Sequence, residues 1–512
     1  MRRFFLWVLP FLMGGICQAE DITIHYNGTT AKVQQQVKDS VNVTIHGAKV
    51  SIESIYEGHK LSLLLTGESE DGQLILKTAG KAKVTLEDLH LTSQEGAPLW
   101  LKNKKKVEVV AADDTENTLT ITACADTANH KSAAIWSKDK LQLSGKGVLN
   151  IFATGDGCRG IKAKDNITIE NLALNVTTTG NHLGEDTTKM MGGFGGPPPN
   201  FNPDDLPEEV KAHIEEMKKK FEEMQKNGEF PMMGGFGGPM GGMRPEGNDS
   251  TRHGGFPPFG NNDDDDHPMG GFGGKHKYIS PTKAIASKGI ITINSGFITV
   301  STCTPGAEGI EGKQGVVLNG GNITVTATDD AINANERIYF NGAHVTAIST
   351  TNDAVDANYG DGGFPPFFGG QDASEQKPAE PAIIITDGEV YAWSQRGAPE
   401  EGLDCDFSPI EVSGGTVFSI GAGMGDMPSV PTNETALQTT ALLIGLNVQK
   451  DEPILVFDSE GKQLESITTP FSLQRSSSLI SHPAFETGKQ YTVRTKDYEK
   501  TFILTENFTV VR

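Results

Sequence analysis

The chain has 512 residues, of which 66 are acidic and 44 basic, so its formal charge is −22, and only 36% of its residues are hydrophobic. A nucleic-acid-binding protein needs a basic surface, which this composition does not supply. Beyond the N-terminus there is no apolar run of the ~20 residues that a membrane-spanning helix requires. These properties argue against a nucleic-acid partner and against a polytopic membrane protein.

The first residues have the pattern of a secretory signal peptide. Two arginines precede the apolar stretch 4–13, and residues 17–19 (CQA) form a small-x-small cleavage site. We therefore expect residues 1–19 to be removed and the protein to be exported, with a secreted, periplasmic or cell-surface location. Lipidation of Cys17 is the alternative, although Ile16 stands where a small residue is expected.

Residues 20–83 alternate apolar and polar side chains, as in VNVTIHGAKVSI. This period of two predicts β-strands. We expect the region to form a β-rich N-terminal cap, because an uncapped stack of strands would expose unpaired backbone groups.

One sequence phrase recurs from about residue 133: a small residue, an apolar anchor, an I-x-I strand, a glycine turn and a V-x-V strand. The anchors Ile285, Ile310, Ile332 and Val355 are spaced 25, 22 and 23 residues apart. This interval fits one coil of a parallel β-helix rather than a propeller blade. We therefore predict an all-β fold with a parallel β-helix over residues 84–436.

Two insertions interrupt this repeat, at 180–282 and at 359–381. Both contain phrases such as MMGGFGGPPP and GDGGFPPFFGG, whose composition predicts flexible, low-complexity segments. Within the first insertion, the spacing of six apolar residues between Leu206 and Met224 predicts one amphipathic helix. This helix either docks on the β-helix wall or serves as a lid or a partner-binding helix, and a cell-surface molecule is the candidate partner.

The repeat is lost near the C-terminus. The segments LLIGLNV, PILVFD and YTVRT alternate like antiparallel strands. We expect residues 437–512 to form a small β-rich C-terminal module.

Four cysteines follow the signal peptide, at positions 124, 158, 303 and 405. They are too scattered for a disulfide scaffold or a zinc site of the CxxC type. Two interpretations stay open: a bridge between Cys124 and Cys158, or free and partly buried thiols.

Two columns of acidic residues flank the apolar anchors. They recur at the same intervals, so they should form two rows in register on successive coils. Like charges ~4.8 Å apart repel each other, which calls for a cation, and Ca²⁺ prefers such oxygen ligands. The alternative is a solvated acidic face. The predicted metal ligands are Glu308, Glu311, Asp330, Asn333, Asp353, Asp356, Glu401, Asp404 and Asp406.

Aromatic residues form two further groups on positions that we expect to face outward. Trp100 and Trp136 extend one of the acidic columns toward the N-terminus, and Tyr391, Trp393 and Phe418 lie on V-x-V strands. Exposed aromatic patches usually mark binding surfaces, and flat β surfaces suit sugar rings. We therefore expect these five residues to bind carbohydrate, unless an insertion or cap covers them.

Basic residues in GDGCRGIKAKD suggest an enzymatic alternative. A metal beside a base such as Arg159 or Lys162 would suit β-elimination of a uronate. Three basic residues in one turn are more often solubilising.

Longer phrases resemble a known family. GESEDG at 67–72, VTLEDLHL at 84–91, GAPLWLKN at 96–103 and TENTLT at 115–120 look like the start of bacterial carbohydrate-binding-domain proteins. These are related to the clostridial cellulose- and polygalacturonate-binding β-helix family. The resemblance implies a right-handed, pectate-lyase-like β-helix that binds calcium and acidic polysaccharide without established catalysis. The chain departs from the pattern at Trp100, where a smaller aromatic residue is common.

The function that we predict is that of an exported, monomeric, non-catalytic carbohydrate-binding protein. Its partner would be an acidic, uronate-containing or plant-type polysaccharide, and Ca²⁺ would mediate binding. A calcium-dependent polysaccharide lyase and a cell-surface scaffold or adhesin are the two alternatives.

Overall fold

The computed structural model describes residues 21–37, 39–55, 57–58, 60–124, 132–181, 282–359, 380–405, 408–422 and 428–512. The chain divides into two compact units, Met1–Leu183 with Ile279–Arg512 and Gly184–Tyr278. The second unit lies outside the described residues, as do the predicted signal peptide, the predicted helix and most of both predicted insertions. All regular elements of the described residues are strands, and among them there is no helix long and apolar enough to cross a membrane.

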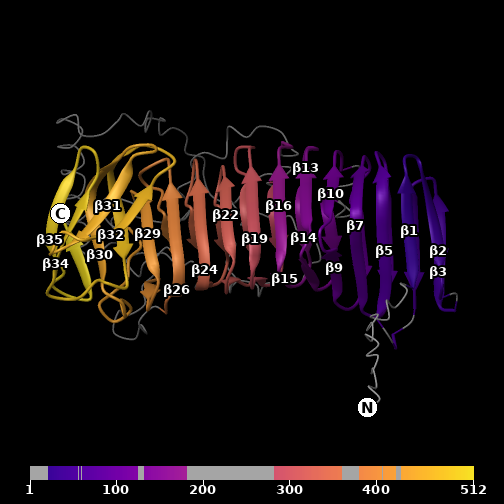
Figure 1. The fold of residues 1–512 in the computed structure, drawn as a ribbon, viewed down its shortest axis with the longest axis horizontal. Helices are drawn as coiled ribbons and strands as arrows, with labels where there is room; N and C mark the ends of the chain where they lie inside the picture. Colours follow the sequence, from indigo (N-terminus) through magenta and orange to yellow (C-terminus); the bar gives the residue numbers. More distant parts are fainter. Residues whose placement is uncertain are drawn as a thin grey trace, which may run out of the picture. The chain divides into compact units, whose positions relative to one another are not determined.

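Successive coils of the first unit stack as a solenoid of parallel strands (Figure 1). Three ladders run along the stack, and three long strands, β7 (Ala82–Ser93), β24 (Ile338–Ser349) and β26 (Ile383–Ser394), take part in two of them. The first ladder contains β3 (Val41–His46), β4 (Lys49–Ser54), β6 (Gln73–Thr78), β8 (Leu99–Asn103), β11 (Ala133–Ser137), β14 (Arg159–Ala163), β17 (Lys283–Ser287), β20 (Glu308–Gly312), β23 (Ile332–Ala334), β25 (Val355–Ala357) and β27 (Leu403–Asp404).

The other two ladders run along the same stack of coils as the first. The second contains β5 (Leu61–Ser69), β7 (Ala82–Ser93), β9 (Val107–Ala111), β12 (Leu141–Gly145), β15 (Ile167–Glu170), β18 (Ile291–Ile293), β21 (Val316–Leu318), β24 (Ile338–Ser349), β26 (Ile383–Ser394) and β28 (Ile410–Val412). The third contains β10 (Glu116–Ile121), β13 (Val148–Ala153), β16 (Leu172–Thr178), β19 (Gly296–Thr302), β22 (Asn322–Ala327) and β29 (Thr416–Gly421), together with parts of β7, β24 and β26.

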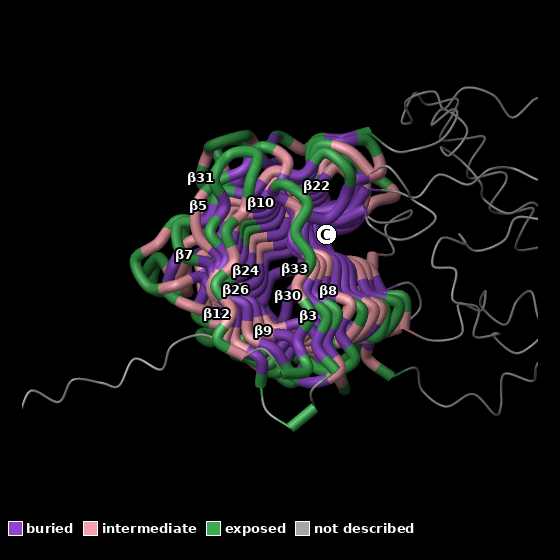
Figure 2. The backbone as a smooth tube through the Cα atoms, turned by 90° about the vertical axis from the view of Figure 1, so that its right-hand side faces the viewer, coloured by how far each residue is buried: buried purple, intermediate pink, exposed green. Residues whose placement is uncertain are grey.

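The predicted anchors form a continuous apolar column inside the solenoid. Ile285 pairs with Ile310, Ile310 with Ile332, and Ile332 with Val355. All four side chains are buried, and an end-on view shows buried residues lining the interior of the coils (Figure 2). The predicted period is confirmed, since each anchor pairs with the equivalent residue of the next coil.

Antiparallel strands are found at both ends of the solenoid. At the N-terminal end, β1 (Ile22–Asn27) pairs with β2 (Thr30–Gln35), and β3 pairs with β4. At the C-terminal end, β33 (Leu473–Ser481) pairs with β29 and with β30 (Thr440–Val448). A four-stranded antiparallel sheet follows, and β36 (Phe508–Val511) pairs with β30 in parallel. The four strands are β31 (Pro453–Asp458), β32 (Gln463–Thr468), β34 (Gln490–Arg494) and β35 (Glu499–Ile503).

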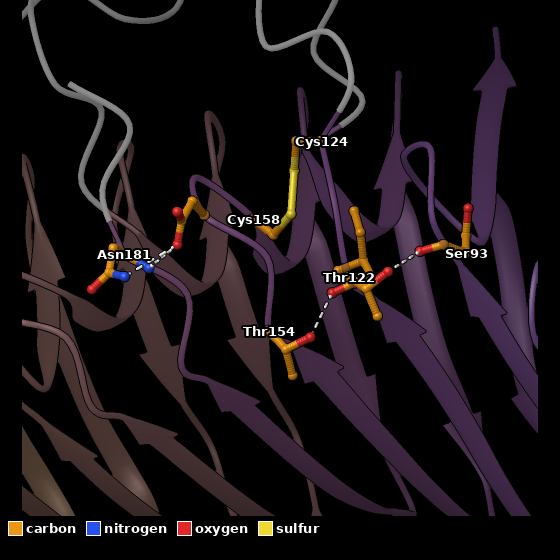
Figure 3. The surroundings of a disulfide bond; sticks show 8 residues. Ser93, Thr122, Cys124, Thr154, Cys158 and Asn181 are labelled. Carbon is orange, nitrogen blue, oxygen red and sulfur yellow. Dashed lines mark hydrogen bonds between the residues drawn. A yellow bond between two sulfur atoms is a disulfide. The ribbon is translucent and has the colours of Figure 1, made fainter.

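A disulfide joins Cys124, which follows β10, to Cys158, which precedes β14 (Figure 3). Of the two interpretations left open by the sequence, the bridge is therefore the one that the structure shows; Cys303 and Cys405 take no part in a disulfide. Beside the bridge, the Asp156 carboxylate accepts hydrogen bonds from the backbone and side-chain amides of Asn181 (2.9 and 3.2 Å). These contacts fix the turn from which β14 starts.

Candidate functional site

The predicted acidic rows lie in register on the first ladder. Glu311 pairs with Asn333, Asn333 with Asp356, and Asp356 with Asp404. The other row follows through backbone contacts: the Gly309 N–H donates to the Asp330 carbonyl, and the Ala354 N–H donates to the Glu401 carbonyl. We call these two rows the acidic ladder; it comprises Glu308, Glu311, Asp330, Asn333, Asp353, Asp356, Glu401 and Asp404. Asp406 lies outside the described residues.

Five of the eight residues of the acidic ladder are buried, and of these only Glu311 belongs to the column that strand alternation predicts to face outward. Glu308, Glu311, Asp330, Asp353 and Glu401 are each at most 8% exposed. The side chains of both rows meet on one side of the strands, since the Asn333 amide donates to the Asp330 carboxylate at 2.8 Å. Asn333, Asp356 and Asp404 remain half-buried and form the accessible part of the ladder.

Lysines neutralise the first two carboxylates of the ladder. Lys283 Nζ lies 3.0 Å from Glu308 Oε1 and also contacts Glu311, which is shared with Lys313. Burial raises the pKa of Glu311, but the charges of Lys283 and Lys313 outweigh it and lower that pKa to about 2. The protein itself therefore supplies the cation at this end of the ladder.

Asp330 and Asp353, on the next two coils, have no such counterion. Among the described residues, no Lys, Arg or His forms an ion pair with either carboxylate. Asp330 accepts hydrogen bonds from the side-chain amides of Asn333 and Asn352, both at 2.8 Å, and Asp353 accepts one from the Glu401 backbone N–H. Neutral donors alone satisfy these two buried acids.

The pKa values of both acids reflect this environment. Burial raises the pKa of Asp330 well above its usual range, and the nearby charges of Asp356 and Asp329 add to the effect. Burial also raises the pKa of Asp353 to about 9, with the Asp404 charge as the next cause. Each carboxylate would therefore be easier to ionise if a cation entered the ladder.

Amide and hydroxyl groups hold the accessible acids in place. Asn333 Nδ2 lies 3.3 Å from Asp356 Oδ2, and Asn358 Nδ2 donates to the same oxygen at 2.7 Å. Ser429 Oγ donates to Asp404 Oδ1 at 2.9 Å. In the described part of the chain, no three His, Cys, Asp or Glu side chains already stand in an arrangement that could hold a metal ion.

Aromatic and basic residues continue the row of Glu311 toward the N-terminus. Trp100 pairs with Trp136, and Trp136 pairs with Lys162. The two indole rings make an edge contact at 6.5 Å, and Lys102 Nζ lies 4.3 Å from the Trp100 ring centroid. Trp100 is half-buried, but Trp136 and Lys162 are each only 6% exposed, so the expectation of exposed tryptophans is wrong for Trp136.

The basic candidates of the lyase alternative are similarly buried. Arg159 is 6% exposed and occupies the position of Lys283 one coil earlier on the first ladder, on β14, which also carries Lys162. The first ladder thus changes from aromatic to basic to acidic along the stack.

The second aromatic group is a core rather than a surface. Trp393 and Phe418 are 2% and 1% exposed and pack in one cluster with residues of the C-terminal strands. Tyr391 is half-buried, stacks on both rings at 6.0 and 6.2 Å, and donates to Glu389. The prediction of exposed sugar-binding rings is wrong for Trp393 and Phe418, because the C-terminal module covers this end of the third ladder.

Sequence reasoning missed Lys283, Lys313 and Ser429. Lys283 had a visible signal, since it stands two residues before the anchor Ile285, where the next coil carries Glu308. Ser429 reaches the ladder from a segment 25 residues after Asp404, and the repeat gives no sign of that contact.

Comparison with known proteins supports the resemblance noted in the sequence. A curated carbohydrate-binding domain-containing protein of Acetivibrio thermocellus is 25% identical over 149 residues, which are 28% of this chain and 50% of the relative; the match thus spans half the length of that relative. A solved structure, described as the polysaccharide lyase-like protein from C. thermocellum in a gadolinium derivative, is 16% identical with a TM-score of 0.37, covering 65% of this chain and 91% of that one. The family model of carbohydrate-binding domain-containing proteins matches residues 46–194 and 261–357. Over these residues, which make up just under half of its length, the chain is similar to the carbohydrate-binding domain-containing proteins.

Proposed function

We propose that this is an exported carbohydrate-binding protein, built as a right-handed, pectate-lyase-like β-helix, that uses Ca²⁺ on the acidic ladder to bind uronate-containing polysaccharide. The family match supports carbohydrate as the class of ligand. Calcium binding is proposed because of a contrast within the acidic ladder. The buried Lys283 forms an ion pair with Glu308, whereas no basic side chain among the described residues forms an ion pair with Asp330 or Asp353.

The donor chemistry at this end of the ladder fits calcium. Asp330, Asn333, Asp353, Asp356 and Asp404 would hold the ion, and all offer the carboxylate or amide oxygens that Ca²⁺ prefers. The Asn333 Nδ2 group donates to both Asp330 and Asp356, so this side chain lies between the two acids, and it would have to turn its amide oxygen toward the ion to serve as a ligand. Bound calcium supplies positive charge to the ladder and an attachment point for the carboxylate of a sugar.

Charge explains why an ion is needed for this ligand. At a formal charge of −22, the protein repels a polyuronate at long range. Asn333, Asp356 and Asp404 are the half-buried, accessible members of the ladder, so a metal held there can reach a polysaccharide from solvent. A bridging cation replaces repulsion by two attractive contacts.

Retention of the protein on polygalacturonate, measured in calcium and in chelator, tests the proposal. The protein should be retained in calcium and lose retention in chelator, and Asp356→Asn should weaken retention at least tenfold. Glu411→Gln is the matched control, because it removes the same charge from β28 on the second ladder and should bind like the parent. Two results would contradict calcium bridging: retention that is unchanged by chelator, or an Asp356→Asn variant that is retained as strongly as Glu411→Gln.

A lyase is the second candidate, because Arg159 and Lys162 lie on the same ladder as the acids. Ultraviolet absorbance of unsaturated sugar products in the same samples tests it. Product formation that is lost in Lys162→Met, with retention kept, would favour the enzyme; absence of product across uronate polymers would favour pure binding. The scaffold alternative depends on the insertions, which lie outside the described residues, and stays a prediction.

A further inference from the structure

Lysines gather along one edge of the solenoid, although the chain as a whole has a formal charge of −22. This edge consists of the turns that lead from the first ladder to the second on successive coils, which Figure 1 shows stacked side by side. The outward position at the end of the first ladder is a lysine on six neighbouring coils, and a second row directly precedes the second ladder on three coils. We call these residues, with two lysines between the rows, the lysine edge: Lys77, Lys102, Lys138, Lys164, Lys288 and Lys313 in the first row, Lys81, Lys106 and Lys140 in the second, and Lys104 and Lys105 between them.

Backbone contacts hold both rows in register. Lys77 pairs with Lys102, and on each later coil the lysine N–H of the first row donates to the carbonyl of the residue that precedes the neighbouring lysine. In the second row, each lysine carbonyl accepts a hydrogen bond from the first second-ladder residue of the preceding coil. Because neighbouring coils lie ~4.8 Å apart, the backbone of the first row extends over about 24 Å.

Buried polar side chains fix the backbone of these turns. The Asn103 side chain donates to the Lys105 carbonyl and the Ser137 hydroxyl donates to the Asp139 carbonyl, both at 2.8 Å. Both donor side chains belong to fully buried residues. The lysines therefore start from defined backbone positions, and a partner that meets them does not have to order the main chain first.

The protein neutralises only part of this positive charge. Lys104, Lys138 and Lys140 are exposed and form no ion pair with any residue that the structure describes. The six turns contain two acidic residues, Asp139 and Asp165. Like charges on neighbouring coils repel each other, so the lysine edge favours an anionic partner. Acidic side chains pair with three other members, Lys77 with Glu53, Lys105 with Glu57 and Lys313 with Glu311.

The described chain enters the solenoid at the same edge. The Asp21 N–H donates to Ser62 Oγ at 3.1 Å, and the Asp21 carboxylate accepts a hydrogen bond from the Ser62 N–H at 2.9 Å. The adjacent Leu61 N–H donates to the carbonyl of Lys81. A lipid on Cys17, the alternative to ordinary signal cleavage, would be attached four positions before Asp21 and would therefore place a membrane near the lysine edge.

We propose that the lysine edge docks the protein on an anionic lipid membrane, with the lysine ammonium groups against the phosphates of acidic headgroups. Clusters of lysines close to a membrane bind anionic lipids, and a strip of two rows suits a plane of headgroups better than a single small anion. Charges farther from the contact than a Debye length of ~8 Å are screened at physiological salt, so the net negative charge of the chain leaves this local attraction in place. The surface needs neither calcium nor carbohydrate and lies outside the acidic ladder, apart from the contact between Lys313 and Glu311.

Cosedimentation of the protein with lipid vesicles in the presence of chelator tests the proposal. Vesicles that contain phosphatidylglycerol should bind the protein more tightly than vesicles of phosphatidylcholine alone, and high salt should abolish the difference. A lipid on Cys17 would insert into both kinds of vesicle, so the difference between them measures the contribution of charge. Lys104→Gln combined with Lys138→Gln and Lys140→Gln should weaken binding to the acidic vesicles at least tenfold, because each lysine at such a surface contributes about fivefold.

The matched control is Lys450→Gln combined with Lys462→Gln and Lys489→Gln. It removes the same charge from exposed positions of the C-terminal module and should bind acidic vesicles like the parent. Thermal unfolding of both triple variants, measured alongside, should match that of the parent, because all six lysines are exposed.

Three results would overturn membrane docking: no preference for acidic vesicles, a lysine-edge variant that binds them like the parent, or an equal loss in the control variant. Polygalacturonate retention of the same variants in chelator covers the other anionic partner. A loss there with vesicle binding unchanged would assign the lysine edge to polysaccharide and would also overturn the proposal. Asp356→Asn should bind acidic vesicles like the parent, so a failure of the calcium site leaves this test independent.

Discussion

Replacing Lys283 by Met tests whether the fold requires this lysine as the counterion of Glu308 and Glu311. The Lys283, Glu308 and Glu311 side chains are 9%, 11% and 6% exposed, so the variant leaves two buried carboxylates with one half-exposed lysine, Lys313. Removing one partner of a buried ion pair costs about 3–5 kcal/mol, because the remaining charge has lost its compensation. We expect this decrease in the free energy of unfolding in calcium-free buffer.

Urea unfolding monitored by tryptophan fluorescence measures the loss. Lys313→Met is the matched control: its side chain is 44% exposed, so the same substitution should cost less than about 1 kcal/mol. Adding Glu308→Gln to Lys283→Met removes one uncompensated charge and should recover part of the loss, with a coupling of about 1–3 kcal/mol. A Lys283→Met variant no less stable than Lys313→Met, or strictly additive effects in the double variant, would refute the assignment of Lys283 as the buried counterion.

Three further predictions concern stability. The double variant Cys124→Ser with Cys158→Ser removes a disulfide between residues 34 apart. The free energy of unfolding should decrease by about 4 kcal/mol, because the unfolded chain gains entropy. Denaturant titration of variant and parent under oxidising conditions measures this decrease. Trp393→Ala should destabilise by about 3–5 kcal/mol and leave polygalacturonate retention unchanged at a temperature where the variant is folded; a selective loss of binding would restore this ring as a ligand contact. Burial lowers the pKa of His482, whose Nδ1 accepts a hydrogen bond from the Ala484 N–H at 3.0 Å. The neutral imidazole therefore contributes stability above pH ~6.5, and this contribution is lost on acidification. Between pH 7 and pH 5, the unfolding temperature should decrease less in His482→Asn than in the parent.

The solenoid was predictable because one rule repeats along the chain. An apolar residue that faces inward on one coil must be covered by an apolar residue of the next, so the spacing of Ile285, Ile310 and Ile332 reveals both the coil length and the strand register. The same spacing placed Asn333 beside Asp356 and Asp356 beside Asp404. Information that recurs once per coil is visible in the sequence.

Contacts made outside this period were not predictable in the same way. Strand alternation suggested that Glu311 faces solvent, but the start of each short strand brings both acidic rows to one side, where Lys283 lies between Glu308 and Glu311. Trp393 occupies an outward position whose covering residues come from the C-terminal module, far along the chain. Neither contact leaves a periodic trace.

Calorimetric titration of calcium into metal-free protein tests the assignment of the acidic ladder most directly. The parent and Glu411→Gln should show saturable binding heat, and Asp356→Asn combined with Asp404→Asn should show none, with the folded state of each variant verified by circular dichroism. Absence of calcium heat in the parent, or a double variant that binds calcium like the parent, would contradict calcium binding at the ladder.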